Sequence, residues 1–365
     1  MFKKLISFLD ELRELPVPGN DCLIWHKGKE VFRYTAGFAD SDGKIPLTGK
    51  ERYQIFSCSK LITCCAALQL WEKGAFQLDD PLYLYLPEYE KMTVRTPEGI
   101  REAQNKITIR HLFTMTAGFN YNLNVPALRR AYDATLGSCP TREMIRALAE
   151  EPLDFEPGTQ WQYSLCHDVL ATVVEVVSGM EFNAFVTKNI FDVLGMKSCT
   201  FLLPSAESHT LLPLHREVPE GKKLCELNSI YNYGTAPFRL GPCYASGGAG
   251  CVSTAEDYNK LLQALCSGET ILKRSTIDLM RTDALNDEQQ KSTWAGPYYS
   301  YGLGVRCPRK GFNERSEFGW GGAAGAYFGI EPEKEWTVLY MQHVYTSSAA
   351  PKRTRIVEFV NEIFK

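Results

Sequence analysis

Strand-like patterns lie at the two ends of this 365-residue chain and leave a helical stretch between them. Near the N-terminus, apolar runs on both sides of Lys27-Gly28-Lys29 predict a β-hairpin. A period-2 pattern returns at residues 301–305, 325–330 and 336–344, with a turn at 331–334. The simplest architecture with this pattern is one sheet that takes strands from both ends of the chain.

The predicted fold class is α+β, with an antiparallel sheet flanked by N- and C-terminal helices and an inserted, mostly helical domain. An apolar face at residues 5–12 and a final helix at 352–364 supply the flanking helices. We expect residues 1–75 plus 240–365 to form the discontinuous sheet domain and residues 76–239 the inserted domain. An active site at their junction would follow.

Charge and composition exclude several function classes. The net charge is −3 with both signs interspersed, so no basic stripe exists to neutralise phosphates and no nucleic-acid partner is expected. No run of eighteen apolar residues occurs, so no membrane partner is expected. Metal ligands at short spacing are missing as well, and we expect neither a metal nor another cofactor.

Twelve cysteines bear on the compartment of the protein. The first apolar run is interrupted by Asp10 and Glu11 and is too short for an export signal. A chain of this length can also build a core without disulfides. We therefore expect reduced thiols and a cytoplasmic location.

Ser57-Cys58-Ser59-Lys60 places a serine and a lysine on one turn of a predicted helix, where positions i and i+3 share a face. Nucleophilic catalysis needs such a base beside the serine. A second S-x-x-K, Ser41 to Lys44, lies in a polar glycine-containing loop that leaves its lysine in water. Ser57 instead begins an apolar helix, where burial favours a neutral Lys60 and the helix dipole favours a developing alkoxide. The tetrapeptide alone favours the simpler interpretation of Ser57 as a helix N-cap, so other motifs must support a catalytic role.

The segment from Ile55 to Gly74 resembles the nucleophile helix of serine β-lactamases and penicillin-binding proteins. A second similarity is Glu156-Pro-Gly-Thr-Gln-Trp-Gln-Tyr163, a turn that delivers a tyrosine before an apolar helix. The resemblance implies that Ser57 is acylated while Lys60 and Tyr163 handle the proton. Leu165 stands where the lactamase members of the family have an asparagine, which removes one contact to the substrate.

A third similarity lies at Phe318-Gly319-Trp320-Gly321-Gly322-Ala323, where Trp320-Gly321-Gly322 replaces Lys-Thr-Gly. The resemblance implies that substrate lies along this strand and that the Ala323 amide joins that of Ser57 in an oxyanion hole. Losing the lysine removes a cation that would hold a substrate carboxylate. Two supporting segments, 107–118 and 246–258, extend the resemblance over nearly the whole chain.

These departures resemble the carboxylesterase branch of the family and favour an esterase acting on a small-molecule ester. A D-specific peptidase or amidase, a transacylase and a weak β-lactamase remain alternatives, so the partner is a small molecule or short peptide. A non-catalytic ligand-binding homologue is the alternative from another class. The sequence leaves the oligomeric state open.

Other residues near the three motifs have more modest interpretations. His167-Asp168 is the one adjacent pair that could serve a Ser-His-Asp triad, but no G-x-S-x-G elbow accompanies it. Cys58 and Cys166 are expected to be packing residues. Four aromatic residues could line the pocket or belong to the core: Tyr121, Trp161, Tyr231 and Tyr244.

Overall fold

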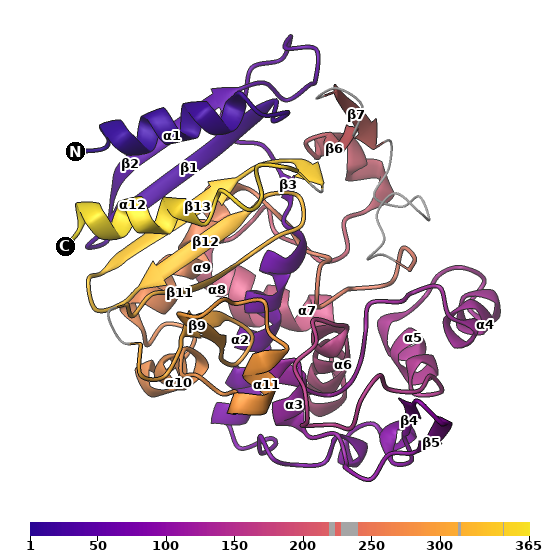
Figure 1. The fold of residues 1–365 in the computed structure, drawn as a ribbon. Coiled ribbons are helices and arrows are strands. Elements are labelled where there is room, and N and C mark those ends of the chain that lie inside the picture. Colours follow the sequence, from indigo (N-terminus) through magenta and orange to yellow (C-terminus); the bar gives the residue numbers. More distant parts are fainter. Residues whose placement is uncertain (219–222, 228–239, 313–314, 346) are drawn as a thin grey trace.

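The central element is a seven-stranded antiparallel sheet in the order β2-β1-β13-β12-β11-β10-β9 (Figure 1). The computed structural model describes residues 1–218, 223–227, 240–312, 315–345 and 347–365. The strands of the sheet are β1 (Gly19–His26), β2 (Lys29–Gly37), β9 (Tyr299–Tyr301), β10 (Arg306–Pro308), β11 (Phe318–Gly321), β12 (Tyr327–Glu331) and β13 (Trp336–Met341). The prediction of one antiparallel sheet built from both chain ends is confirmed.

The hairpin between β1 and β2 follows from its turn residues. Lys27 and Gly28 both have positive φ, 52° and 71°. Two residues with positive φ form the type I′ turn, whose twist matches that of the flanking strands. The predicted N-terminal hairpin is therefore confirmed in position and in turn.

Two helices from opposite ends of the chain, α1 (Lys3–Arg13) and α12 (Arg355–Ile363), lie side by side on one face of the sheet (Figure 1). Their apolar residues form one core with alternate residues of the central strands. This core includes Leu5, Phe8, Leu9, Leu12, Val338, Tyr340, Ile356 and Val360. The opposite face, which carries Phe328 and Leu339, belongs to the larger core that contains α9 (Ala255–Ser267).

Helices dominate the middle of the chain, as predicted, with α2 (Ser59–Glu72) packed against α6. The other helices are α3 (Ile109–Thr114), α4 (Pro126–Ala134), α5 (Thr141–Leu148), α6 (Cys166–Ser178), α7 (Phe182–Val186), α8 (Asp192–Leu194), α10 (Arg274–Met280) and α11 (Asp287–Lys291). Short strands lie outside the main sheet: β3 (Tyr53–Gln54), β4 (Thr93–Thr96), β5 (Gly99–Glu102), β6 (Leu214–Val218), β7 (Lys223–Leu227), β8 (Val252–Ser253) and β14 (Val344–Tyr345). The domain boundaries after residues 75 and 239 stay predictions.

The strand predicted at residues 301–305 is wrong in its bounds. β9 ends at Tyr301 and β10 begins at Arg306, so residues 302–305 form the tight connection between them. The Gly302 amide donates to the Val305 carbonyl at 2.9 Å, and Gly304 has a φ of 88°. Leu303 and Val305 are buried although they lie in a turn. Their burial produced the alternating pattern without strand pairing.

Cysteines contribute to the core as free thiols. Eleven of the twelve have a described side chain, and ten of these are buried. Burial raises the pKa of the Cys58 thiol to about 12 and that of Cys166 to about 11. A thiol with so high a pKa is a poor nucleophile at neutral pH. The structure therefore agrees with a packing role for both residues.

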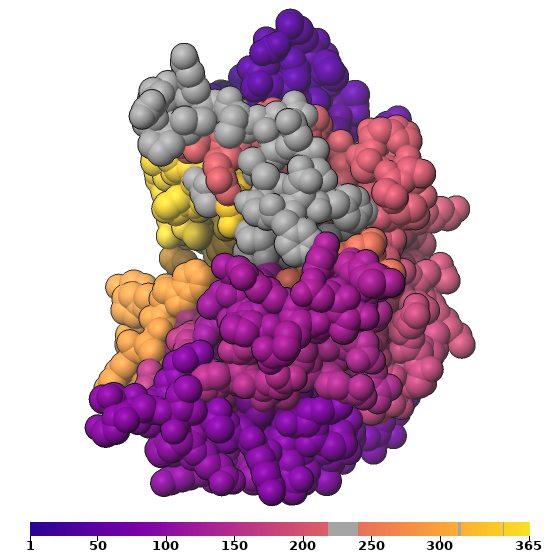
Figure 2. All heavy atoms as spheres, turned by 90° about the vertical axis from the view of Figure 1, so that its right-hand side faces the viewer, coloured from indigo at the N-terminus to yellow at the C-terminus, as the bar shows by residue number. Residues whose placement is uncertain are grey.

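Figure 2 shows the face to which the middle of the chain contributes most. Its violet to pink atoms fill the lower and right-hand parts of this view, and the indigo N-terminal segment projects at the top.

Within the described ranges, no one helix combines the length and hydropathy needed to cross a bilayer. One bent pair, Cys166–Ser178 with Phe182–Leu194, does pass on length and composition.

His111 caps α3 and supports the turn that precedes Tyr163. The Thr108 hydroxyl accepts from the His111 amide, and the His111 Nδ1 atom accepts from the Thr108 amide at 3.2 Å, which completes a capping box. Gly158 lies directly against the same ring, since a Cβ on it would be 3.0 Å from the His111 Nε2 atom. Burial, with a smaller contribution from the Arg110 charge, lowers the pKa of His111 to about 4.

Acid should therefore destabilise the fold through His111. As pH falls from 6.5 towards 4, the unfolded chain takes up the proton and the folded chain does not, so up to about 3 kcal/mol is lost. His111→Gln keeps the acceptor for the cap without titrating. Between pH 7 and about pH 4.5, the unfolding free energy in urea should fall by roughly 2–3 kcal/mol less in His111→Gln than in the wild type. Equal losses in the two proteins would contradict this role of His111.

Candidate active site

Ser57 lies in a single 3₁₀ turn, η1 (Phe56–Cys58), directly before α2. The Cys58 amide donates to the Ile55 carbonyl at 3.2 Å and closes this turn. Phe56 has a φ of 45°, which costs a non-glycine residue about 1–2 kcal/mol. Its ring packs with Leu214 and Ala324. Tertiary packing thus holds a strained backbone beside the serine.

Lys60 follows one turn later and is completely buried. Its Nζ atom lies 3.4 Å from the Ser57 Oγ atom, 2.7 Å from the Tyr121 hydroxyl and 2.7 Å from the Gly248 carbonyl oxygen. The carbonyl can only accept, so the lysine donates to it. A neutral amine that also donates to Tyr121 would keep its lone pair for the Ser57 hydroxyl. The structure therefore brings the predicted serine and lysine together.

The glycine-rich segment 246–250 encloses the lysine. The Thr63 hydroxyl of α2 donates to the Gly247 carbonyl at 2.7 Å and fixes this segment against the helix. A Cβ on Gly248 would lie 2.5 Å from the Asp168 Oδ2 atom and 3.3 Å from the Lys60 Nζ atom. Only glycine fits at this position, because polar groups from α2 and α6 converge on it.

Asp168, on α6, is a buried carboxylate in the same cluster. Its Oδ1 atom accepts from the Tyr244 hydroxyl at 3.0 Å and from the Ser246 hydroxyl at 2.7 Å. Burial raises the pKa of Asp168, whereas the Ser246 hydroxyl and the Lys60 charge lower it. The carboxyl group of Asp168 thus lies behind the lysine, on the side away from Ser57.

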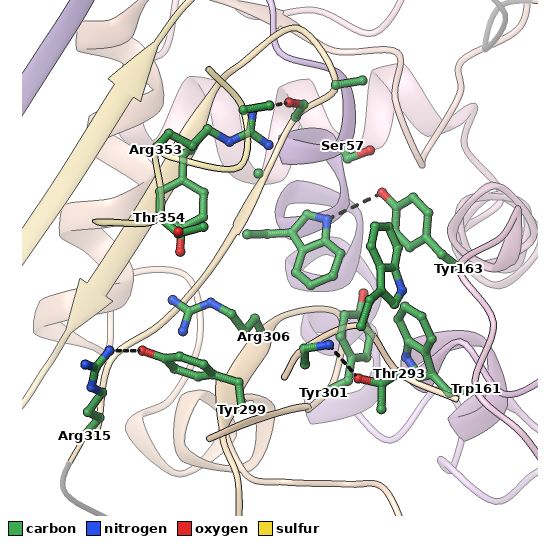
Figure 3. A pocket seen from close by; sticks show the side chains of 18 of the residues that line it. Ser57, Trp161, Tyr163, Thr293, Tyr299, Tyr301, Arg306, Arg315, Arg353 and Thr354 are labelled. Carbon is green, nitrogen blue, oxygen red and sulfur yellow. Dashed lines mark hydrogen bonds between the residues drawn. The ribbon is translucent and has the colours of Figure 1, made fainter. Parts of the chain in front are cut away.

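Tyr163 lies between Lys60 and Trp320. Its ring centroid is 4.5 Å from the Lys60 Nζ atom, and its hydroxyl accepts from the Trp320 indole at 3.4 Å (Figure 3). The hydroxyl bonded to the lysine is that of Tyr121. Burial raises the pKa of Tyr121 well above its usual range, with the neighbouring Tyr163 adding to the effect. Two tyrosines, and not one, therefore surround the lysine.

The end of β11 meets the turn that carries Ser57. A Cβ on Gly322 would lie 2.3 Å from the Ile55 carbonyl oxygen, so the two backbones are in direct contact. The Gly325 amide donates to the Gly322 carbonyl at 3.0 Å and forms a turn with Ala323 at its second position. Among the described residues, the Ala323 amide has no hydrogen-bond acceptor. This amide is therefore available to a ligand.

All of the predicted strand residues line one pocket with Ser57 and Tyr163. The pocket has a volume of about 520 Å³. Trp161, Tyr163 and Tyr301 lie together on one side, whereas Tyr299 lies with Arg306 and Arg315 on the other (Figure 3). The aromatic residues are Trp161, Tyr163, Trp294, Tyr299, Tyr301, Trp320 and Tyr327, and the arginines are Arg306, Arg315 and Arg353.

Of the four aromatic candidates, Trp161 lines this pocket. Tyr121 and Tyr244 instead contact Lys60 and Asp168 from behind. Tyr231 lies outside the described residues. The rival serine, Ser41, lies in an exposed loop whose Lys44 pairs with Asp42 at 2.9 Å and has 74% of its side chain exposed.

Sequence reasoning missed several members of the site. The contact of Tyr121 with the lysine and the location of Asp168 depend on how α2 and α6 pack, which no local pattern reports. The Ser246-Gly-Gly run was a usable signal for Gly248. Trp294 and Arg353 come from loops that carry no motif, and their positions in the pocket had no sequence signal.

Comparison with known proteins gives the family. The family model described as Beta-lactamase matches residues 7–361. The chain belongs to this family. Esterase EstB from Burkholderia gladioli is 28% identical over 364 residues, covering 94% of this chain and 91% of its own. The prediction of a β-lactamase-related protein is confirmed.

Solved structures agree on the fold. EstCE1, described as a hydrolase with promiscuous acyltransferase activity, has a TM-score of 0.78 and 24% identity, and the match covers 97% of each chain. Simvastatin synthase (LovD) from Aspergillus terreus has a TM-score of 0.79 and 23% identity, with 96% of this chain and 95% of LovD covered. The predicted β-lactamase and transpeptidase-like architecture is therefore confirmed.

Gly322→Ala should push the end of β11 away from the turn that carries Ser57. Its Cβ would collide with the Ile55 backbone oxygen, which cannot move without displacing the Ser57 turn. We expect kcat on p-nitrophenyl butyrate to fall by roughly 100-fold, as when an oxyanion-hole donor is lost. In the control Gly74→Ala, the φ of 72° is strained but the Cβ meets nothing. This control should lose about 1 kcal/mol of stability and keep its kcat. Equal effects on kcat would contradict the contact at Gly322.

Proposed function

We propose that the protein is a serine hydrolase that forms an acyl-enzyme on Ser57 and acts as an esterase on small-molecule esters. One observation carries the proposal: a completely buried lysine amine lies 3.4 Å from the Ser57 hydroxyl at the wall of an open pocket. With its other contacts to Tyr121 and Gly248, the amine is held within reach of the serine proton, the position that a general base needs.

In the proposed first step, the Ser57 Oγ atom attacks the ester carbonyl carbon while its proton moves to the Lys60 Nζ atom. The amides of Ser57 and Ala323 would hold the oxyanion that develops. Removing one such donor typically lowers kcat by about 100- to 1000-fold. The free Ala323 amide and the contact of Gly322 with Ile55 support this assignment.

In the second step, the bond from the carbonyl carbon to the alcohol oxygen breaks and the proton passes from Lys60 to the departing alkoxide. We assign this relay to Tyr163, whose ring centroid is 4.5 Å from the Lys60 Nζ atom and which lines the pocket with Ser57. Water then attacks the acyl carbonyl carbon and gives a proton to the same groups. The bond from that carbon to the Ser57 Oγ atom breaks, the serine takes the proton back, and the carboxylic acid leaves. Tyr121 and Asp168 would position the lysine and balance its charge.

Esters fit this pocket better than β-lactams do. Trp320 occupies the strand position of the family's lysine, and Leu165 is buried where an asparagine would contact the substrate amide. Esterase EstB is the first of the curated relatives, and EstCE1 is a hydrolase that also transfers acyl groups. Acyl transfer to an alcohol is therefore the second candidate function. We keep the cytoplasm as the predicted location, where buried thiols stay reduced.

The nucleophile can be tested with a fluorophosphonate probe. We expect the wild type to gain one adduct on Ser57 and to hydrolyse p-nitrophenyl butyrate. Ser57→Ala should lose both properties, and Ser41→Ala, in the rival S-x-x-K, should keep both. Intact-mass spectrometry with peptide mapping gives the adduct site. A non-catalytic binding homologue would leave Ser57 unlabelled, which would overturn the proposal.

The reaction class can be tested by substrate comparison. We expect p-nitrophenyl butyrate to be turned over at least about 100-fold more efficiently than nitrocefin or a D-aminoacyl p-nitroanilide, because the two family contacts for those substrates are replaced. Adding a primary alcohol would divide the acyl group between water and the alcohol. Accumulation of the new ester without a change in p-nitrophenol release would identify a transacylase. A preference for nitrocefin would contradict the ester assignment.

A further inference from the structure

We infer that Arg353 is a positioning residue that orients and polarises the peptide of the proposed oxyanion hole. The guanidinium Nη1 atom donates to the Gly322 carbonyl oxygen at 3.0 Å. That carbonyl belongs to the same peptide group as the Ala323 amide. The inference rests on the proposed function, because it concerns the amide assigned to hold the oxyanion.

Three hydrogen bonds fix this stretch of backbone. The Gly322 oxygen accepts from Arg353 and also from the Gly325 amide at 3.0 Å, so both of its lone pairs are used. The Gly322 amide donates to the Ala326 carbonyl at 2.7 Å. The peptide between Gly322 and Ala323 is planar, so fixing its carbonyl also fixes the direction of its N–H group.

Polarisation acts through the same peptide. A cationic donor on a carbonyl oxygen draws electron density from the peptide nitrogen, and hydrogen bonds in a chain strengthen one another by roughly 10–30% each. The Ala323 amide has no acceptor among the described residues. Its polarised N–H group would therefore form a stronger hydrogen bond with an oxyanion in the pocket. The benefit grows as negative charge develops, so it favours the transition state over the bound ester.

The charge of Arg353 is not neutralised locally. In the described part of the chain, no carboxylate lies within ion-pair distance of it, whereas Arg306 on the same wall pairs with Glu317 at 3.5 Å. Burial lowers the pKa of Arg353, and its Nε atom is buried without a partner. Within the described part of the chain, the one hydrogen bond of this partly buried guanidinium goes to the Gly322 carbonyl.

Figure 3 shows the Arg353 guanidinium reaching towards the side of the pocket where Ser57 lies. A Cβ on Gly321 would lie 2.7 Å from the Arg353 Nη2 atom, so this strand residue also leaves room for the guanidinium. Arg353 lies directly before α12. In the sequence it is near the opposite end of the chain from Ser57. The C-terminal end of the chain therefore completes the site.

The test compares Arg353→Gln, Arg353→Met and Arg353→Lys with the wild type. We expect kcat on p-nitrophenyl butyrate to fall by roughly 10- to 100-fold in the first two, with KM within about threefold, because a transition-state contact is weakened. Affinity for a boronic acid that mimics the tetrahedral intermediate should fall by the same factor. Arg353→Lys should recover part of the kcat and part of the boronic acid affinity, since it keeps a cation.

Lys352→Gln is the control. It removes the neighbouring exposed charge and should change neither kcat nor the boronic acid affinity.

A second readout excludes a merely structural effect. Without the Arg353 bond, the carbonyl stretch of an acyl-enzyme trapped on Ser57 should move to higher frequency, because the oxyanion hole polarises it less. An unchanged kcat, or a rise in KM with unchanged boronic acid affinity, would overturn the inference. Activity that survives in Ser57→Ala would instead overturn the proposed function. Arg353→Lys keeps the test decisive if the neutral variants do not fold.

Discussion

A buried lysine side chain organises the centre of this structure. Lys60 is removed from water, and a buried amine without partners would cost several kcal/mol. Its partners come from different parts of the chain: the Tyr121 hydroxyl and the Gly248 carbonyl, with Asp168 close by. Helices α2 and α6 and the glycine-rich segment must therefore converge on one point. The same convergence leaves the amine beside Ser57.

The other half of the site depends on a backbone contact. Gly322 at the end of β11 packs against the Ile55 carbonyl, and this contact sets the distance between the strand and the Ser57 turn. Arg353 then holds the peptide that follows Gly322. Serine and lysine come from the first fifth of the chain, whereas strand and arginine come from its last sixth. A central sheet built from both chain ends is what allows them to meet.

Local patterns predicted those parts of the molecule that depend on neighbouring residues. The hairpin at Lys27 and Gly28, the terminal helices and the pairing of Ser57 with Lys60 on one helical turn all follow from short-range geometry. The contacts of Lys60 with Tyr121 and Gly248 do not, because they arise from tertiary packing between distant segments. The prediction of a strand at residues 301–305 was wrong for a related reason, because a buried turn can show the same apolar alternation as a strand. Arg353 gave no signal because its role is defined by one backbone carbonyl.

The central claim is that a buried lysine activates Ser57 to carry an acyl group. The most direct measurement is rapid acid quenching during turnover of p-nitrophenyl butyrate, followed by intact-mass spectrometry and peptide mapping. The structure predicts one butyryl group on Ser57 in the wild type, formed at the rate of the p-nitrophenol burst, with both lost in Lys60→Met. Turnover with no covalent adduct, or an adduct on another residue, would contradict the claim.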